Sequence, residues 1–198
     1  MIRLGITGGI GSGKTSVCRV FSVLRVPVFY ADLEARNIMD SDSSVISNIN
    51  SIAGRDMYKN GSLDRLELAN LIFNNEKLLQ KVNSTVHPVV LEHFKQWEKF
   101  QDSEYVIMEA AILFESGAAT LMDRILSVIA PVGERIARVI KRNNLTREQV
   151  IERIKNQTTD EEKISKSHYV IDNSENVMII PAIINIHEEI LNIINGKV

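Results

Sequence analysis

The sequence has little of several features that mark particular classes of protein. Its 198 residues contain one cysteine, Cys18, so no disulfide can form within the chain and a reducing compartment is expected. The longest apolar run, residues 177–184, contains Pro181 and is far shorter than the roughly 20 residues that a membrane-spanning helix requires. No secretory signal pattern follows Met1, where a glycine-rich segment begins within a few residues. We therefore expect a cytoplasmic protein without a membrane partner.

Neither sign of charge dominates the sequence. The chain carries 23 lysines and arginines against 25 aspartates and glutamates, a formal net charge of −2. Because proteins that wrap nucleic acid usually carry a basic surplus, we expect no nucleic-acid partner. The four histidines lack the paired spacing of a structural zinc site. Hydrophobic residues make up 44% of the chain and charged residues 24%, which is typical of a folded globular domain.

Short apolar segments that alternate with helical patterns predict an α/β fold. Buried strands are expected at residues 2–6, 26–30, 105–108, 125–130 and 169–171. Residues 14–24 predict a helix between the first two strands, so the chain opens with a βαβ unit. Continuous apolar strands separated by helices indicate a parallel sheet with helices on both faces. The sequence therefore predicts a five-stranded parallel sheet flanked by helices.

The strongest functional signal lies between the first strand and the first helix. Residues 8–15, GGIGSGKT, match the phosphate-binding loop pattern GxxxxGK[ST] in full, in the required position. A loop with few side chains lets successive backbone N–H groups point at the oxygens of a polyphosphate. Lys14 can then reach the β and γ phosphates, and the Thr15 hydroxyl is placed to coordinate Mg²⁺. We assign nucleoside triphosphate binding to the loop residues and the first turn of the helix: Gly9, Ile10, Gly11, Ser12, Gly13, Lys14, Thr15 and Ser16.

Two carboxylates that follow predicted strands are candidates for further chemistry. Asp32 is expected at the carboxyl edge of the sheet, where it could orient or deprotonate a hydroxyl that attacks the γ phosphate. It could equally N-cap a helix that starts at Leu33. Glu109 ends an apolar strand, where an acid can hold Mg²⁺ directly or through water, or be an ordinary strand-end residue. Position alone leaves both pairs of alternatives open.

Two insertions interrupt the sheet pattern. Residues 32–103 read as almost wholly helical, with a turn at residues 60–62, a helix over residues 63–73 and another that Pro88 opens. The second insertion, residues 132–168, is rich in charge, and residues 146–149 spell a capping box at the start of its second helix.

Three arginines in the second insertion, Arg135, Arg138 and Arg142, fall on one face of its first helix. Such a stripe is usually solvated, but on a lid it could clamp phosphate oxygens. Arg153 and Gln157, four residues apart on the next helix, could face the same site.

The motifs narrow the class of phosphate-loop protein. A GTPase switch would carry an NKxD motif, and residues 156–160, NQTTD, lack its lysine and its spacing. A helicase or transporter ATPase would need a longer chain. The remaining class is a small phosphotransferase with three parts. We expect a nucleotide-binding core of residues 1–31, 104–131 and 169–198, an acceptor-binding subdomain of residues 32–103 and a lid of residues 132–168.

Over nearly its whole length the chain resembles the dephospho-CoA kinase family. The motifs that carry the resemblance occur in order: residues 5–14, Ala31-Asp32 with Ala35-Arg36, residues 60–65, His87-Pro88, residues 112–115, residues 138–142, Arg153 with Gln157, and residues 169–173. The phosphate loop alone is shared by many enzymes, but this ordered combination is specific. The chain departs from the family pattern at Glu109-Ala110-Ala111, where the family usually has aspartate, any residue and proline.

The resemblance implies an activity and a set of roles. The enzyme would transfer the γ phosphate of ATP to the ribose 3′-hydroxyl of dephospho-CoA, the last step of coenzyme A synthesis, with ATP and Mg²⁺ required. The implied roles are: Asp32 and Lys14 in catalysis, Arg138 and Arg142 as lid residues that neutralise transition-state charge, Asn173 near the adenine, and Arg65, His87 and Glu109 in acceptor binding. Nothing in the sequence specifies an oligomeric state, and a monomer is compatible with it.

Two other classes remain as alternatives. A nucleoside monophosphate kinase shares the loop and the lid but accepts a 5′-phosphate. A non-catalytic ATP-dependent switch would bind ATP without phosphate transfer to any acceptor.

Overall fold

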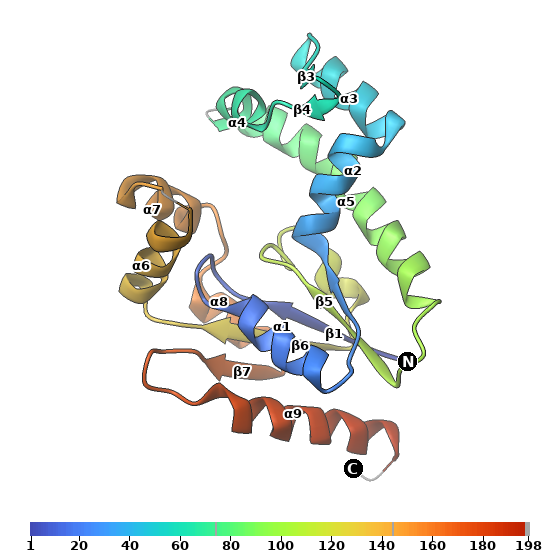
Figure 1. Cartoon of the computed structure of the whole chain (residues 1–198), viewed down its shortest axis with the longest axis vertical. Coiled ribbons are helices and arrows are strands. Elements are labelled where there is room, and N and C mark those ends of the chain that lie inside the picture. The colour runs from blue at the N-terminus through green and yellow to red at the C-terminus, as the bar shows by residue number, and fades with distance from the viewer. Residues whose placement is uncertain (74, 144, 197–198) are drawn as a thin grey trace. The chain divides into compact units, whose positions relative to one another are not determined.

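The computed structural model describes residues 1–73, 75–143 and 145–196 (Figure 1). The chain divides into two compact units. Residues 1–30 and 100–198 form the first, called here the sheet unit, and residues 31–99 form the second, called the helical unit. Over the residues described, no helix is both long and apolar enough to cross a membrane.

The sheet unit is built on five parallel strands, as predicted. They lie in the order β2-β5-β1-β6-β7. Their bounds are β1 (Ile2–Thr7), β2 (Val28–Tyr30), β5 (Tyr105–Glu109), β6 (Arg124–Ile129) and β7 (Tyr169–Asp172). In the register of the central strand, Ile6 lies opposite both Glu109 and Leu126. The chain that leaves β1 therefore emerges at the centre of the carboxyl edge, where parallel sheets bind ligands.

Helices cover both faces of this sheet (Figure 1). On one face α1 (Lys14–Val23) and α9 (Ile179–Ile194) pack against each other and against the strands. The main core between them is made of side chains from these helices and from four strands, among them Leu4, Ile6, Phe21, Val128 and Ile183. Elsewhere in the unit a short 3₁₀ helix, η1 (Ala118–Leu121), follows β5, and α8 (Asp160–Ser165) packs against β6.

A helical hairpin follows β6. Its helices are α6 (Val132–Asn143) and α7 (Arg147–Lys155). A small core of Ile136, Val139 and Val150 joins them, and the side chain of Ile10 packs against this core. The predicted capping box is confirmed, because Gln149 N donates to Thr146 Oγ1 at 3.3 Å and Thr146 N donates to Gln149 Oε1 at 3.0 Å.

The described residues of the helical unit form four helices and one short hairpin. The elements are α2 (Ala31–Ser41), α3 (Ser43–Ala53), β3 (Tyr58–Lys59), β4 (Ser62–Leu63), α4 (Arg65–Phe73) and α5 (Glu76–Glu98). The turn predicted at residues 60–62 is confirmed: Asn60 and Gly61 have φ of 53° and 79°. Two consecutive left-handed residues form a type I′ turn, which suits the two-residue hairpin between β3 and β4.

Two helix starts predicted in this unit are wrong. Pro88 lies inside α5, twelve residues after its first residue, and does not open a helix. A proline in a helix interior costs roughly 3 kcal/mol. The buried side chains of Val82, Val86, Val90 and Phe94 form one apolar stripe on both sides of Pro88, and their packing holds the helix continuous. The helix expected from residue 63 starts at Arg65 instead, because Leu63 pairs with Tyr58 in the hairpin.

Candidate active site

The phosphate loop joins β1 to α1 and is folded by its own backbone. Ser12 N donates to Gly9 O at 3.0 Å, and Gly13 N-caps α1 with φ of 96°. A side chain at residue 13 would be strained at this φ, and its Cβ would lie 2.0 Å from Asn173 Nδ2. Gly13 is therefore required for the turn into the helix and for the close approach of Asn173.

Lys14 and Glu109 meet beneath the loop. Lys14 Nζ donates to Gly8 O at 3.0 Å and lies 3.9 Å from Glu109 Oε1. Only 9% of the Lys14 side chain and 8% of the Glu109 side chain are exposed. Because Glu109 ends β5 opposite Ile6, the parallel register brings its carboxylate to the start of the loop. The structure thus joins two predicted site residues that are 95 positions apart in the sequence.

Polar groups around the loop have hydrogen-bonding capacity that the described residues do not use. Thr7 Oγ1 and Ser12 Oγ are buried without a hydrogen-bond partner among those residues. Thr15 and Ser16 are exposed in the first turn of α1. Buried hydroxyls in folded proteins are normally paired, so unpaired ones mark a place for a polar ligand or water. At a helix N-terminus such groups suit an anion.

Asn173, directly after β7, and Arg138, on α6, approach the loop. Asn173 Nδ2 donates to Ser12 O at 2.7 Å. Arg138 Nη2 donates to Asn173 O and to Glu134 Oε2, both at 2.8 Å, while Arg138 Nη1 is buried and has no partner among the described residues. The side chain of Arg142 is exposed and donates from Nε to Asn143 Oδ1 at 2.7 Å. The described contacts therefore link Asn173 and Arg138 to the loop, but do not link Arg142 to it.

Arg135, which the sequence placed in the arginine stripe, contacts the loop in a way that the sequence did not predict. It is only 3% exposed. Its Nε donates to Ile10 O at 3.0 Å, and its Nη1 donates to Asp160 Oδ2 at 2.7 Å. The arginine stripe was expected to face solvent or to clamp phosphate, but Arg135 binds the backbone of the loop. No local signal could have revealed this, because its partners are 125 and 25 residues away in sequence.

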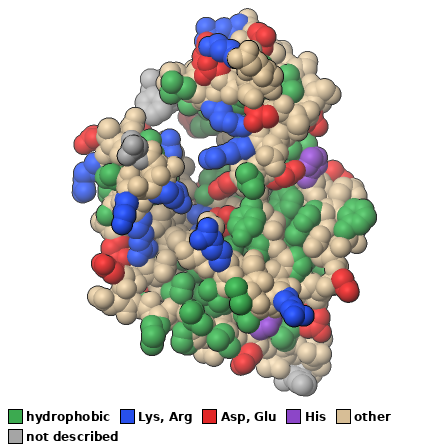
Figure 2. Space-filling model, viewed as in Figure 1, with side chains coloured by type: hydrophobic (Ala, Val, Ile, Leu, Met, Phe, Trp, Pro, Cys, Tyr) green, Lys and Arg blue, Asp and Glu red, His purple; other side chains and the backbone are tan. Residues whose placement is uncertain are grey.

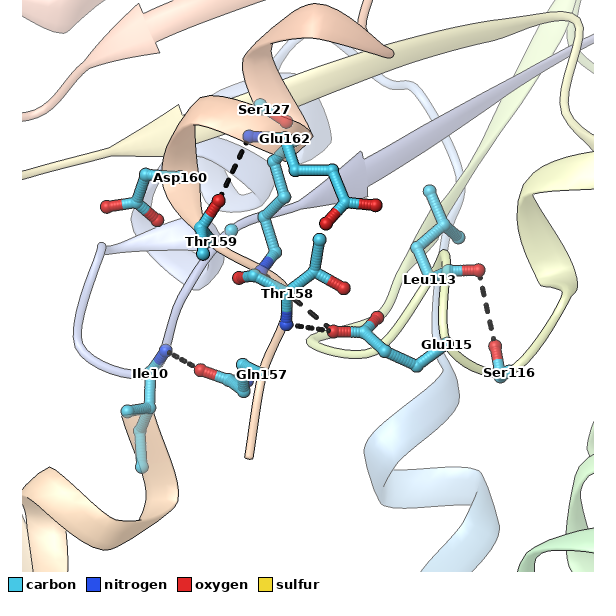
Figure 3. A network of polar contacts seen from close by, with 12 residues as sticks. Ile10, Leu113, Glu115, Ser116, Ser127, Gln157, Thr158, Thr159, Asp160 and Glu162 are labelled. Carbon is cyan, nitrogen blue, oxygen red and sulfur yellow. Dashed lines mark hydrogen bonds and ion pairs between the residues drawn. The ribbon is translucent and has the colours of Figure 1, made fainter. Parts of the chain in front are cut away.

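A network of polar contacts lies between the α7–α8 connection and the segment after β5 (Figure 3). Gln157 Oε1 accepts a hydrogen bond from Ile10 N at 2.8 Å, and Thr158 N donates to Glu115 Oε1 at 2.8 Å. Lys163, whose side chain is fully buried, donates from Nζ to Thr158 O and lies 4.0 Å from Glu115 Oε1. Gln157 therefore faces the phosphate loop, as the sequence suggested, but it lies two residues beyond the end of α7 and not on that helix as expected. Arg153 is exposed without a described contact there.

The electrostatics of this network follow from burial and hydrogen bonding. Burial lowers the pKa of Lys163, and the nearby carboxylates of Glu115 and Asp160 oppose that shift. Burial also raises the pKa of Glu115, but the hydrogen bonds from the backbone of Thr158 and from its own backbone outweigh it, so the pKa lies below its usual value. The network therefore favours the charged form of Glu115, but it offsets only part of the cost of burying the charge of Lys163.

Three predicted site residues lie in the helical unit. Asp32 is exposed in the first turn of α2, and its carboxylate has no hydrogen bond or ion pair within the described part of the chain. Because α2 begins at Ala31, Asp32 is inside the helix and is not its N-cap. Arg65 Nη2 donates to Asp40 Oδ2 at 2.5 Å and to Arg36 O at 3.0 Å. Burial lowers the pKa of His87, which is partly buried on α5.

Few groups could hold a metal ion. Among residues 1–73, 75–143 and 145–196, no cluster of three or more histidine, cysteine, aspartate or glutamate side chains could do so. Mg²⁺ in phosphotransferases needs only one or two protein oxygens in addition to phosphate oxygens and water. The Thr15 hydroxyl at the start of α1 and the Glu109 carboxylate are oxygen donors of that kind at the loop.

Comparisons with known proteins agree with this arrangement. The family model described as Dephospho-CoA kinase matches residues 2–178. The chain is 38% identical over 186 residues to the Dephospho-CoA kinase of Bacteroides fragilis, which covers 93% of this chain and 91% of that protein.

Solved structures share the fold. A crystal structure from Thermus thermophilus has a TM-score of 0.84 and 30% identity, covering 95% of this chain and 97% of its own. The Dephospho-CoA kinase from Campylobacter jejuni has a TM-score of 0.70 and 21% identity, covering 99% and 98% of the two chains. Since the family model spans most of the sequence and a 38% identical relative covers nearly all of it, the chain belongs to the dephospho-CoA kinase family.

Proposed function

We propose that this chain transfers the γ phosphate of ATP to the ribose 3′-hydroxyl of dephospho-CoA, giving CoA and ADP. The observation that carries the proposal is a complete phosphate loop, with Lys14 and Glu109 at its base, in a chain of this family. The loop supplies the phosphate donor site, and family membership supplies the acceptor.

On the donor side, the backbone N–H groups of residues 9–16 and the ammonium of Lys14 would bind the phosphates of ATP. Asn173, which holds Ser12 O, is assigned to the edge of the site nearest the adenine. Arg138 Nη1 is buried next to this position without a partner among the described residues, and it would neutralise charge on the transferred phosphate. Arg142 is assigned the same task from the exposed side of α6.

Mg²⁺ fits the oxygen donors at the loop. The Thr15 hydroxyl would be its protein ligand, with the remaining positions taken by phosphate oxygens and water. When bound, Mg²⁺ neutralises charge on the phosphates during transfer. Glu109 would stay beside Lys14 and contact the acceptor hydroxyl or a metal-bound water, because its carboxylate already lies at the base of the loop.

The acceptor would be bound by residues 32–103, with Arg65 and His87 as contacts, and residues 132–168 would act as the lid. Asp32 follows β2 by two residues in the sequence, and its carboxylate is exposed without a described partner. In the reaction, the 3′-oxygen forms a bond to the γ phosphorus as the bond from that phosphorus to the β–γ bridging oxygen breaks. Asp32 accepts the proton of the hydroxyl and later releases it to solvent.

The test is a phosphorylation assay with purified protein, Mg-ATP and dephospho-CoA. CoA formation, identified by mass spectrometry with the phosphate located at the 3′ position by ³¹P NMR, is the expected result. A panel of nucleoside 5′-monophosphates serves as the comparison. ADP formation with a monophosphate but not with dephospho-CoA would make the chain a nucleoside monophosphate kinase. ATP binding without transfer to any acceptor would make it a switch.

A further inference from the structure

Ile10, in the middle of the phosphate loop, contacts the α6–α8 region in three ways. Its side chain packs against the small core of the α6–α7 hairpin. Its carbonyl oxygen accepts a hydrogen bond from Arg135 Nε at 3.0 Å. Its N–H donates to Gln157 Oε1 at 2.8 Å (Figure 3). Ile10 therefore contacts the proposed lid through its side chain and through both of its backbone polar groups.

The contact with Gln157 uses a group that a phosphate loop normally offers to its ligand. Backbone N–H groups of such loops bind phosphate oxygens. The amide oxygen of glutamine is a neutral acceptor with partial negative charge, whereas a phosphate oxygen is charged and forms a stronger hydrogen bond with the same donor. A phosphate oxygen can therefore replace Gln157 at the Ile10 N–H.

Gln157 is presented to the loop by a backbone that is fixed on both sides. Thr158 N donates to Glu115 Oε1 at 2.8 Å, and the buried Lys163 donates to Thr158 O. Gln157 N itself donates to Ile154 O at 3.1 Å, at the end of α7. The amide oxygen thus reaches Ile10 from a held segment, and the contact is a built feature of this region.

We propose that Gln157 is a positioning residue that occupies the Ile10 N–H until a phosphate oxygen of ATP replaces it. This inference rests on the proposed function for the identity of the nucleotide. The contact between Arg135 and Ile10 uses the carbonyl oxygen, so it is compatible with phosphate binding at the N–H. The exchange lowers the affinity for ATP by the worth of one hydrogen bond and loosens the α7–α8 connection from the loop once ATP is bound.

Removing the acceptor at residue 157 should tighten ATP binding, whereas giving it a charge should weaken ATP binding. Gln157→Met keeps the length of the side chain but removes the acceptor, so ATP no longer has to displace it. The dissociation constant for a non-hydrolysable ATP analogue with Mg²⁺ should fall roughly two- to tenfold, which is the worth of one net hydrogen bond. Gln157→Leu should change it in the same direction.

The Gln157→Glu substitution places a charged acceptor at the same N–H. Its carboxylate forms the stronger, charge-assisted hydrogen bond and also repels the phosphates. The dissociation constant for the same analogue should rise by more than about tenfold. A role in stability alone would make Gln157→Met and Gln157→Glu both weaken binding, so opposite signs for these two variants distinguish a competing acceptor from a structural contact.

Gln149→Met is the matched control. Gln149 closes the capping box of α7, so its loss loosens the helix that precedes Gln157, but it has no described contact with the phosphate loop. Its dissociation constant for the analogue should equal that of the unmodified chain. Equal tightening by Gln149→Met and Gln157→Met would mean that the effect comes from a loosened helix, and it would overturn the proposal.

Isothermal titration calorimetry measures these constants without any acceptor. Unchanged or weaker binding by both Gln157→Met and Gln157→Leu, in protein whose thermal unfolding shows an intact fold, would also overturn the inference. Should the unmodified chain bind the analogue but fail to phosphorylate dephospho-CoA, the proposed function fails while the binding series still decides the role of Gln157.

Discussion

Charged side chains are used differently in the two units of this protein. Near the phosphate loop of the sheet unit, the side chains of Lys14, Arg135 and Lys163 are at most 9% exposed, and each of them donates to a backbone carbonyl. On the helical unit, ion pairs are more exposed: the side chain of Arg65 is 40% exposed and that of Arg55 is 56% exposed.

The difference in exposure matters because water can hydrate an exposed charge that has lost its partner. A buried charge that loses its partner cannot recover hydration, whereas an exposed one can. Figure 2 shows that other lysine and arginine side chains gather over the α6–α7 hairpin, so the buried Arg135 belongs to a region that also has exposed basic groups. We infer that charges near the loop hold a binding geometry in place, while those of the helical unit are available to a ligand.

The largest expected effect tests whether an exposed charge of the helical unit can be essential. Asp32→Asn should lower kcat roughly 10²- to 10⁴-fold, because the hydroxyl loses its proton acceptor. The dissociation constant for ATP should stay the same, and stability should change by less than about 0.5 kcal/mol for an exposed residue. Steady-state kinetics and calorimetry check these values. Glu34→Gln, which removes another carboxylate two residues away, is the control, and near-normal turnover by Asp32→Asn would exclude the proposed role.

Replacing a buried charged residue near the loop should mainly lower the free energy of unfolding. Arg135→Met should reduce the free energy of unfolding by about 2–4 kcal/mol, because Asp160 and the Ile10 carbonyl both lose their donor. Urea denaturation followed by circular dichroism measures it. Combining it with Asp160→Asn should recover part of the loss, since the unpaired carboxylate is then gone. A loss below about 1 kcal/mol would contradict the view that buried charges near the loop differ from exposed ones.

Replacing an exposed arginine of the helical unit should change stability little and should instead change the KM for the acceptor. Arg65→Ala should change the free energy of unfolding by less than about 1 kcal/mol, because its pair with Asp40 is partly solvated. If Arg65 binds a phosphate of dephospho-CoA, KM for this substrate should rise roughly ten- to hundredfold, while KM for ATP stays constant. Arg55→Ala removes a comparable ion pair and should leave both KM values unchanged. Parallel changes in both KM values would argue against an acceptor-specific role.

The smallest effect concerns His87. Because burial lowers its pKa in the folded state, the unfolded chain binds more protons between that pKa and the ordinary value of 6.5. Stability should therefore fall as pH drops through 6.5 and level off below the folded pKa. Thermal unfolding between pH 5 and 8 should show a steeper fall for the unmodified chain than for His87→Gln. Equal slopes would mean that His87 is as solvated in the folded chain as in the unfolded one.

Local patterns predicted much of the fold. The strands of the βαβ start, the phosphate loop, the hairpin turn at residues 60–62 and the capping box at residues 146–149 were all readable, because each depends on neighbours within a few residues. The role of Pro88 was not readable in this way. Whether a proline ends a helix depends on the burial of residues on either side, which packing against other helices determines.

The candidate site also has features that the local sequence predicts and features that depend on tertiary contacts. The sequence by itself determined the phosphate loop and the order of motifs that marks the family, since covalent spacing sets both. Only the tertiary structure brought Glu109 to Lys14, buried Arg135 against Ile10 and paired Gln157 with the loop N–H. These contacts join residues 95 to 147 positions apart, so their geometry depends on sheet register and helix packing, which no short stretch of sequence contains.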